Sequence, residues 1–302
     1  MSYSALLAKA HELEAAAQTM GALGAELRLR QTGQDGDPRV RGALQAVVKN
    51  LEPGLLDGLE PDQIAAIIGH VTYALQEALD LIREPERAPG WGYKDPAILQ
   101  ERGRGSRAAA RNFANLARQR PALAALLGDC RFLDIGTGVG WLAIETAKTW
   151  PGMRVVGLDI WEPSLQLAAA NIAAEGLQER ITLRRQSVTE IDDEAAFDLV
   201  WLPSPFLPRD VVDSALPRVV HALAPGGFLL FGMFVSPRPG PLSHALTDLL
   251  TIRSGGHPWR SGEAEERLRA VGLRDVEYAG VMESGPSLSA GASDQQTVIW
   301  GR

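Results

Sequence analysis

The pattern of apolar positions changes near residue 128. Before that point apolar residues recur at helical spacing, and the strict alternation of apolar and polar residues that is typical of strands is missing. The pattern predicts helices near residues 3–30, 39–51, 61–83, 95–101, 105–119 and 122–127. Proline occurs in the first turn of two of these segments, at Pro61 and Pro121, where helices accept it. The sequence therefore predicts an all-helical N-terminal domain over residues 1–128.

From Arg131 onward, short apolar runs alternate with helical patterns. The runs lie at residues 131–135, 154–159, 181–185, 197–202 and 227–232, and the helical patterns at 141–149, 163–175 and 209–223. Such alternation is typical of an α/β fold with a doubly wound, mostly parallel sheet. Two further runs, 276–280 and 297–301, are separated by a Ser/Gly-rich loop and predict an antiparallel closure. We expect a seven-stranded sheet in a second domain over residues 129–302.

Composition and charge narrow the class of protein. Hydrophobic residues make up 45% and charged residues 22% of the 302 residues, and no run of eighteen apolar residues is present, so a membrane protein is not expected. The first helix carries Glu12 and Glu14 and lacks the basic head of a secretion signal, which predicts a cytoplasmic protein. Cys130 is the single cysteine and is interpreted as an inert core thiol. The net charge of −7 argues against a general nucleic-acid binder.

A glycine-rich turn follows the first apolar run of the second domain. In "RFLDIGTGVGWLAIETA" three glycines, Gly136, Gly138 and Gly140, stand between a predicted strand and a predicted helix. Glycines let the backbone bend sharply there and approach a ligand that a Cβ atom would block. The spacing is G-x-G-x-G, rather than the G-x-G-x-x-G of dinucleotide binders, and Asp134 precedes the first glycine on the strand. The turn predicts a nucleotide-type ligand.

The next strand ends in an acidic residue. "MRVVGLDI" places Asp159 twenty-three residues after Gly136, where a carboxylate can accept hydrogen bonds from both hydroxyls of a ribose. An NAD-dependent dehydrogenase would show a similar arrangement and is the alternative interpretation of these two elements.

Over residues 128–302 the chain resembles the class I S-adenosylmethionine-dependent methyltransferases. The resemblance rests on LDIGTGVG, VVGLDI, FDLVWLP and LAPGGFLLFG, which follow one another in the order and at the spacing of that family. It implies a Rossmann-like methyltransferase fold and S-adenosylmethionine as the cofactor. It further implies that the backbone of 136–140 lies against the methionine portion, that Asp159 holds the ribose, and that Asp134 orients the turn or meets the amino group through water. The cofactor-binding residues implied in this way are Asp134, Gly136, Thr137, Gly138, Gly140, Asp159, Ile160, Trp161, Ser187, Val188, Leu202 and Pro203.

The chain departs from the family's pattern after the third strand. Family members often carry an acidic residue there, close to the adenine amino group, whereas this chain has Ser187 followed by Val188. The Ser187 hydroxyl can still accept a hydrogen bond. Further on, "IDDE" at 191–194 resembles the carboxylate pair of metal-dependent catechol-type enzymes, but no third ligand is evident, so no metal is expected.

The predicted strand at 197–202 runs into the sequence Pro203-Ser204-Pro205-Phe206. Amino-group methyltransferases of the family carry Asn/Asp-Pro-Pro-Tyr/Phe here, whose first side chain accepts a hydrogen bond from the target amine. Pro203 has no side-chain acceptor, while Phe206 matches the aromatic position. Two interpretations stand: Ser204 acts as a catalytic residue that holds an amine, or the prolines end the strand and shape the floor of a pocket.

Other candidate residues come from a loop and from the helical half. His257, in "IRSGGHPWR", is a candidate general base for a hydroxyl acceptor or else a solvated loop residue. Trp91 and Tyr93 either pack on a sulfonium by cation–π attraction or anchor the linker. Arg107 belongs to an arginine stripe that is either a solvated face or a binding site for a carboxylate. Together with Phe206, the last three form the predicted substrate pocket.

The leading hypothesis is methyl transfer to an oxygen or nitrogen of a small molecule, with the N-terminal helices as lid and homodimer interface. A rival within the same fold uses S-adenosylmethionine without methyl transfer, by cyclisation or side-chain transfer, and releases methylthioadenosine. A third hypothesis is a non-catalytic cofactor-binding subunit. The expected partner is a small-molecule substrate, with neither nucleic acid nor membrane.

Overall fold

The computed structural model of the protein describes residues 2–235, 240–260, 262–282 and 296–301. The chain divides into two compact units, Met1–Arg87 and Ala88–Arg302. These bounds differ from the predicted domains 1–128 and 129–302. The reason is that the helices between residues 96 and 127 pack on the sheet and belong to the second unit.

The first unit contains three helices, α1 (Tyr3–Thr32), α2 (Pro38–Leu51) and α3 (Pro61–Arg83). Their starts are set by caps: Ser2 accepts from the N–H of Ala5, Asp37 accepts from that of Arg39, and proline follows directly at the first positions of α2 and α3. Leu23 and Leu27 of α1 are buried within this unit. The three helices agree with the sequence prediction for this segment.

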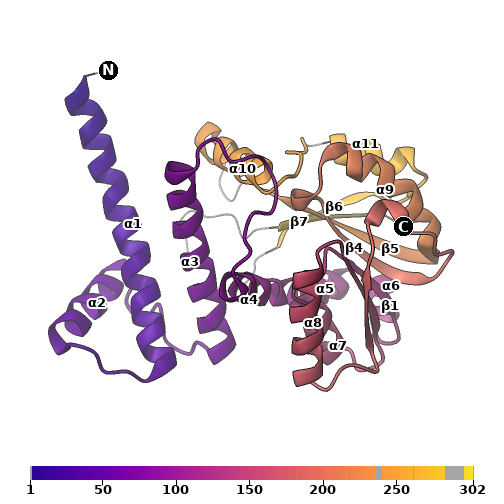
Figure 1. The fold of residues 1–302 in the computed structure, drawn as a ribbon, viewed down its shortest axis with the longest axis horizontal. Helices are drawn as coiled ribbons and strands as arrows, with labels where there is room; N and C mark the ends of the chain where they lie inside the picture. The colour runs from indigo at the N-terminus through magenta and orange to yellow at the C-terminus, as the bar shows by residue number, and fades with distance from the viewer. Residues whose placement is uncertain (1, 236–239, 261, 283–295, 302) are drawn as a thin grey trace. The chain divides into compact units, whose positions relative to one another are not determined.

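The second unit is an α/β sheet domain (Figure 1). Its sheet has the order β3-β2-β1-β4-β5-β7-β6, in which β7 is antiparallel to both of its neighbours and the first five strands are parallel. The predicted α/β fold with a mostly parallel sheet is thus confirmed. The strands are β1 (Arg131–Ile135), β2 (Arg154–Asp159), β3 (Ile181–Arg185), β4 (Phe197–Pro203), β5 (Leu223–Phe234), β6 (Glu277–Met282) and β7 (Gln296–Gly301). The helices are α4 (Pro96–Gly105), α5 (Arg107–Gln119), α6 (Pro121–Leu127), α7 (Trp141–Thr149), α8 (Glu162–Ala174), α9 (Arg209–Ala222), α10 (Pro241–Arg253) and α11 (Glu263–Ala270), with the short 3₁₀ turns η1 (Val188–Glu190) and η2 (Ser204–Phe206).

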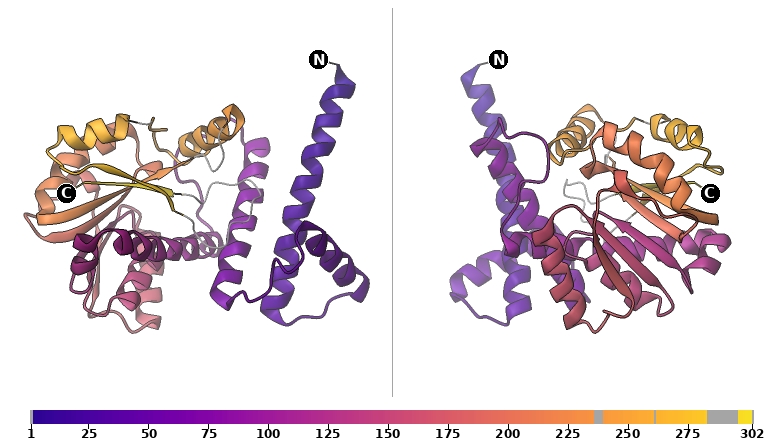
Figure 2. Two further views of the ribbon diagram at one scale, coloured as in Figure 1. Left: turned by 180° about the vertical axis from the view of Figure 1, so that it is seen from behind. Right: turned by 45° about the vertical axis from the view of Figure 1, so that its right-hand side comes forward.

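Helices cover both faces of this sheet, as the views in Figure 2 also show. One face packs against α5, α6, α7 and α8, where Phe113 lies edge-on to Phe132 and close to Trp201, with ring centroids 6.1 and 5.5 Å apart. The other face packs against α9 and α11.

Cys130 is buried beside the first of these cores, and burial raises the pKa of its thiol, which suits the inert role that was predicted. Within the described ranges no helix has the length and hydropathy to cross a bilayer.

The chain reverses its direction of winding between β1 and β4. From β1 it proceeds outward through β2 and β3, then returns to place β4 on the other side of β1. In open α/β sheets the crevice for a ligand lies at such a switch point, outside the carboxyl ends of the strands. The ends of β1, β2 and β4 carry Asp134, Asp159 and Pro203. The topology therefore brings three of the predicted residues to one edge.

Candidate functional site

The turn between β1 and α7 is built from left-handed glycines. Gly136, Gly138 and Gly140 have φ values of +68°, +56° and +83°, a region that residues with a Cβ atom adopt only under strain. A Cβ atom on Gly138 would meet nothing closer than 3.9 Å, so that position opens toward the crevice. The N–H of Thr137 donates to the carbonyl of Leu158 at 2.8 Å and ties the turn to β2.

Asp159 holds this turn through its carboxylate. Its Oδ2 accepts from the N–H of Gly138 and its Oδ1 from the N–H of Trp161, each at 2.9 Å. Burial raises the pKa of Asp159, and these backbone donors oppose that shift. A carboxylate has about four lone-pair sites, so each oxygen keeps capacity for a ligand hydroxyl. These free acceptor sites fit the hydroxyl groups of the ribose of a nucleoside cofactor.

Asp134 lies behind the turn, with 1% of its surface exposed. The hydroxyl of Thr137 donates to it at 2.8 Å. Burial raises the pKa of Asp134 to about 7, and the nearby charge of Asp159 acts in the same direction. A carboxyl group that ionises near neutral pH can respond to a cationic ligand, whose positive charge favours the ionised form. This placement fits the predicted role of Asp134 beside the turn.

Stability is expected to depend on the protonation of Asp134. Its ordinary pKa is 3.8, so between about 4 and 7 the folded chain holds a proton that the unfolded chain releases. The free energy of unfolding should therefore fall as pH rises through that window. Asp134→Asn removes this titration, so its stability relative to the parent chain should increase from about pH 5 to about pH 8 in chemical denaturation. A constant difference across that range would contradict the assignment.

Helix α4 is fastened over the glycine turn by a side-chain network that the sequence analysis missed. Oε1 of Gln100 accepts from the indole N–H of Trp141 at 2.8 Å and from the amide of Asn171 at 3.1 Å. The amide of Asn171 also donates to the carbonyl of Val139 inside the turn, at 2.8 Å. A Cβ atom on Gly103 would lie 2.1 Å from the Val139 side chain, so only glycine lets α4 approach this closely. Gln100 pairs with Asn171, 71 positions away, so no local sequence pattern reveals the network. Gly103, a glycine inside a helix, is the one sequence feature that indicates a close approach of α4 to another element.

Gln100→Ala is expected to raise the KM for the cofactor about tenfold, since each lost hydrogen bond to a partly buried partner is worth roughly 1 kcal/mol. Gln100→Glu keeps an acceptor for Trp141 and Asn171 but loses the donor to Oδ1 of Asn171, 3.0 Å away, so it should restore only part of the affinity. Gln119→Ala, an exposed change on α5, serves as the control. Unchanged cofactor KM in a folded Gln100→Ala chain would show that the network does not position the turn.

Aromatic side chains gather beyond the ends of β4 and β5. Trp91 lies edge-on to Tyr93 and to Phe206, with ring centroids 5.7 and 6.2 Å apart, and Phe206 meets Phe234 at 5.7 Å. The guanidinium of Arg102 stacks on Trp91, 4.5 Å from its ring centroid. Three predicted pocket residues, Trp91, Tyr93 and Phe206, are thus brought together. Arg102 and Phe234 join them and were missed, because nothing in the local sequence marks them as neighbours of Phe206.

Ser204 does not have the exposure that its predicted catalytic role requires. It is fully buried, and its hydroxyl donates to the carbonyl of Gly232 on β5 at 2.7 Å. Pro203 lies beside the glycine turn, since a Cβ atom on Gly136 would be 3.6 Å from its ring, and Leu202 is fully buried. The geometry favours the structural interpretation of this segment, in which the prolines end β4 and Ser204 fastens it to β5.

His257 contacts charged residues at the starts of α9 and α11. Its Nε2 lies 3.4 Å from the carboxylate of Glu263 and 3.4 Å from the guanidinium of Arg209, and its ring meets Trp259 edge-on at 4.8 Å. The loop that carries it passes beside η2, where a Cβ atom on Gly256 would lie 2.3 Å from the carbonyl oxygen of Pro205. The structure thus places the imidazole beside Glu263, Arg209 and Trp259.

The Arg107 side chain packs against α7 and lies close to two carboxylates. Its guanidinium stacks on Trp141 at 4.2 Å and lies 3.6 Å from Glu145 and 4.0 Å from Glu175. That Arg107 lines the substrate pocket stays a prediction, and the sequence pattern of the helical stripe does not reveal the acidic partners on α7 and after α8. Asp193 of the IDDE segment likewise forms an ion pair, with Arg184 at 2.8 Å.

The remaining predicted residues surround the end of β2 and η1. Ile160 is exposed, while Trp161 packs partly against the core beside α8. Val188 is buried, and the Ser187 hydroxyl accepts from the N–H of Thr189 and so caps η1. The Ser187 hydroxyl also lies 2.8 Å from that of Thr189, and either can be the donor, so Ser187 keeps a lone pair for a ligand when it donates to Thr189.

Comparison with known proteins agrees with this geometry. Residues 132–227 match a family model described as a methyltransferase domain. The chain is 36% identical over 120 residues to the ribosomal protein uL3 glutamine methyltransferase of Bordetella pertussis, covering 37% of this chain and 40% of that one. It is 34% identical over 110 residues to the demethylmenaquinone methyltransferase of Thermus thermophilus, covering 36% of this chain and 50% of that one. The chain thus spans half or less of the length of these relatives.

A solved structure shares the fold over nearly the whole length. Human N-acetylserotonin methyltransferase in complex with S-adenosylmethionine superimposes with a TM-score of 0.60 at 17% identity, covering all of this chain and 98% of that one. The match includes the N-terminal helical region as well as the sheet. The glycine turn, Asp159 at the end of β2 and the family match over 132–227 together identify the second unit as a class I S-adenosylmethionine-dependent methyltransferase domain.

Proposed function

We propose that the protein transfers the methyl group of S-adenosylmethionine to an oxygen or nitrogen of a small, largely apolar molecule. The observation that carries the proposal is the aromatic group formed by Trp91, Tyr93, Phe206 and Phe234 at the carboxyl ends of β4 and β5. Ligand sites in α/β domains are mostly apolar, with few polar groups that orient the ligand. Aromatic edges and faces of this kind suit a flat acceptor.

The end of β4 argues against an amide acceptor. One relative is named a ribosomal protein glutamine methyltransferase, and the amino-group enzymes of this fold hold their target with an acceptor side chain at the place of Pro203. Proline offers no such acceptor, and Ser204 is buried on Gly232. A small hydroxyl or amine acceptor needs less from this position, which favours it over a protein glutamine.

The chain's own contribution is positioning. When bound, S-adenosylmethionine supplies a methyl group on a sulfonium that is already an activated leaving group. The protein then has to hold the acceptor in line with the methyl group and exclude water. Holding the two reactants together in this geometry supplies much of the increase in reaction rate. Asp159 and the glycine turn fix the cofactor side, while Trp91 and Phe206 would orient the acceptor. We assign no general base, and an acceptor that ionises near neutral pH would need none.

Product identification tests the proposal. The protein is incubated with S-adenosylmethionine alone and then with phenols and amines of increasing size, and the adenosine product is identified by mass spectrometry. S-adenosylhomocysteine together with a methylated acceptor supports methyl transfer. Methylthioadenosine formed without acceptor would establish the non-methylating alternative instead. Trp91→Ala should raise the KM of an accepted phenol several-fold with little change in the cofactor KM, and Trp91→Phe should restore it.

The proposal includes the pairing of two copies through the N-terminal helices. Its support is the first half of α1, in which residues 2–18 are exposed and Leu6 and Leu13 show 60% and 61% of their surface. Burying such side chains against a second copy is favourable by the hydrophobic effect. Light scattering of the parent chain and of Leu6→Glu measures the association state; a monomeric parent chain would contradict this part of the proposal.

A further inference from the structure

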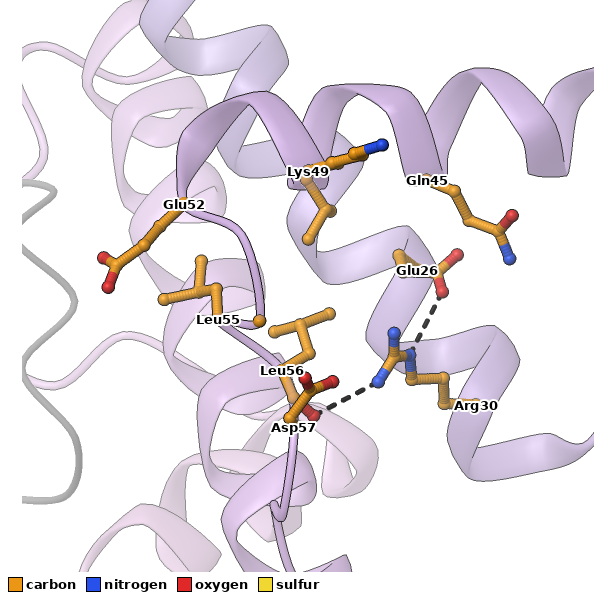
Figure 3. Close-up of a pocket in the computed structure, with 10 residues that line it drawn as sticks. Glu26, Arg30, Gln45, Lys49, Glu52, Leu55, Leu56 and Asp57 are labelled. Carbon is orange, nitrogen blue, oxygen red and sulfur yellow. Dashed lines mark hydrogen bonds and ion pairs between the residues drawn. The ribbon is translucent and has the colours of Figure 1, made fainter.

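A cavity of about 120 Å³ lies within the first unit, between α1, α2 and the segment that follows α2. It is separate from the cofactor turn, whose residues all belong to the second unit. Figure 3 shows the side chains around it. The lining consists of Glu26, Arg30, Gln45, Val48, Lys49, Glu52, Gly54, Leu55, Leu56 and Asp57. A space of this size can hold several water molecules or a short aliphatic ligand.

Glu26 gives the cavity a chemical character. It is 2% exposed, and its Oε1 accepts from the Nε of Arg30 at 3.1 Å. Its Oε2 is buried and has no hydrogen-bond partner among the described residues. No nitrogen of Arg30 donates to Oε2. Its Nε donates to Oε1 of Glu26, and its Nη1 donates to the carbonyl of Leu56 at 3.2 Å. A buried carboxylate oxygen without a donor is costly, so a ligand that donates to it binds favourably.

The geometry selects the kind of donor. A guanidinium fork binds carboxylates through two parallel hydrogen bonds, but Oε1 of Glu26 is already engaged by Arg30. An ammonium group is a compact charge that needs a single oxygen. Val48 and Leu56, both buried, supply an apolar wall for methylene groups. The exposed residues Gln45 and Lys49 stand at the opening, where they can move without disturbing the packed core.

The rim adds negative charge. Glu52 and Asp57, both exposed, lie at the edge of the cavity, and Lys49 is the one cation among the lining residues besides Arg30. Since Arg30 is paired with Glu26, the two rim carboxylates exceed the remaining positive charge. A second ammonium group at the other end of a short chain would be attracted to that rim.

We propose that this cavity binds a short aliphatic amine, with an ammonium group donating to Oε2 of Glu26 and the chain lying along Val48 and Leu56. A diamine of about four carbons fits both the inner carboxylate and the acidic rim. The site is independent of methyl transfer: it uses residues of the first unit alone and would be present whatever acceptor the second unit takes.

Calorimetric titration of the full chain with 1,4-diaminobutane tests the proposal, with 1-butanol as the neutral analogue. Binding of the diamine and its absence for the alcohol are expected. Glu26→Gln keeps a carbonyl oxygen for Arg30 but places an amide donor where the ligand's ammonium would lie, so it should weaken diamine binding at least tenfold. Glu86→Gln, an exposed change after α3, is the matched control and should bind like the parent chain.

Two readouts keep the result interpretable. Titration of Glu26→Gln with S-adenosylhomocysteine should match the parent chain, which shows that the variant is folded and that the cofactor site is unaffected. Equal diamine binding by Glu26→Gln and the parent chain, or no heat at millimolar diamine, would overturn the proposal. A third outcome is that the parent chain self-associates, Glu26→Gln does not, and the diamine gives no heat. The cavity would then hold a lysine of a second copy, and the small-ligand site would be overturned.

Discussion

Asp159→Asn is expected to reduce the affinity for S-adenosylhomocysteine about 100-fold. The carboxylate accepts from two backbone N–H groups, those of Gly138 and Trp161. An asparagine amide has one oxygen, so it can accept from one of the two and places its NH₂ group against the other. The loss of a charge-assisted bond and the unpaired donor cost roughly 3 kcal/mol, before any lost contact to the ribose is counted.

Calorimetry with S-adenosylhomocysteine measures this change without turnover. Asp193→Asn is the matched control, because Asp193 is also a paired carboxylate but lies on the segment after η1, bonded to Arg184. It should leave the affinity within about twofold, because the Asp193 carboxylate bonds to Arg184 and to no N–H group of the glycine turn. An Asp159→Asn chain that binds as tightly as the parent would show that Asp159 does not hold the turn.

Gly140→Val is expected to lower the melting temperature by about 10 °C and to abolish cofactor binding. The residue has φ +83°, where a β-branched side chain is strained, and a Cβ atom would lie 3.2 Å from that of Ala168 on α8. Strain of roughly 1–2 kcal/mol and crowding of roughly 1–3 kcal/mol add at this position. In a chain of this size each kcal/mol corresponds to about 2–4 °C.

Gly176→Val separates the two contributions. Gly176 has φ +67°, but a Cβ atom there meets nothing within 4 Å. It should show the backbone strain alone, a decrease of about 4 °C, and should bind the cofactor normally. Differential scanning fluorimetry of the two variants gives the comparison. Equal decreases would mean that contact with Ala168 does not constrain the turn.

The cofactor side of the site could be predicted from the sequence because it is encoded locally. One strand, one turn and the end of the next strand contain Asp134, the three glycines and Asp159, and parallel pairing of β1 with β2 brings these ends together without further information. The alternation of apolar runs with helical patterns likewise fixed the layers of the sheet domain. Local pattern and long-range pairing agree here, as expected for natural sequences.

The acceptor side depends on contacts between distant residues, which a local pattern does not reveal. Gln100 meets Asn171 across 71 positions, and Ser204 meets Gly232 across 28. Ser204 is a candidate catalytic group by sequence because it directly follows Pro203, which stands where the family's motif has its acceptor, while the carbonyl that accepts its hydrogen bond belongs to the neighbouring strand. The contacts of Arg107 are hidden from a local pattern in the same way, since Glu145 lies on α7 and Glu175 directly follows α8.

The position of β7 has a consequence for synthesis of the chain. Among the described residues this strand lies between β5 and β6 and is the one sheet neighbour of β6, although β6 comes earlier in the sequence. As the chain leaves the ribosome, β1 to β5 can assemble around the switch point first, because their pairing needs nothing that follows. Until β7 arrives, β5 is an open edge, a template on which another nascent chain can pair. The growing protein therefore passes through a stage in which its nucleotide crevice is complete and its sheet is still vulnerable to aggregation.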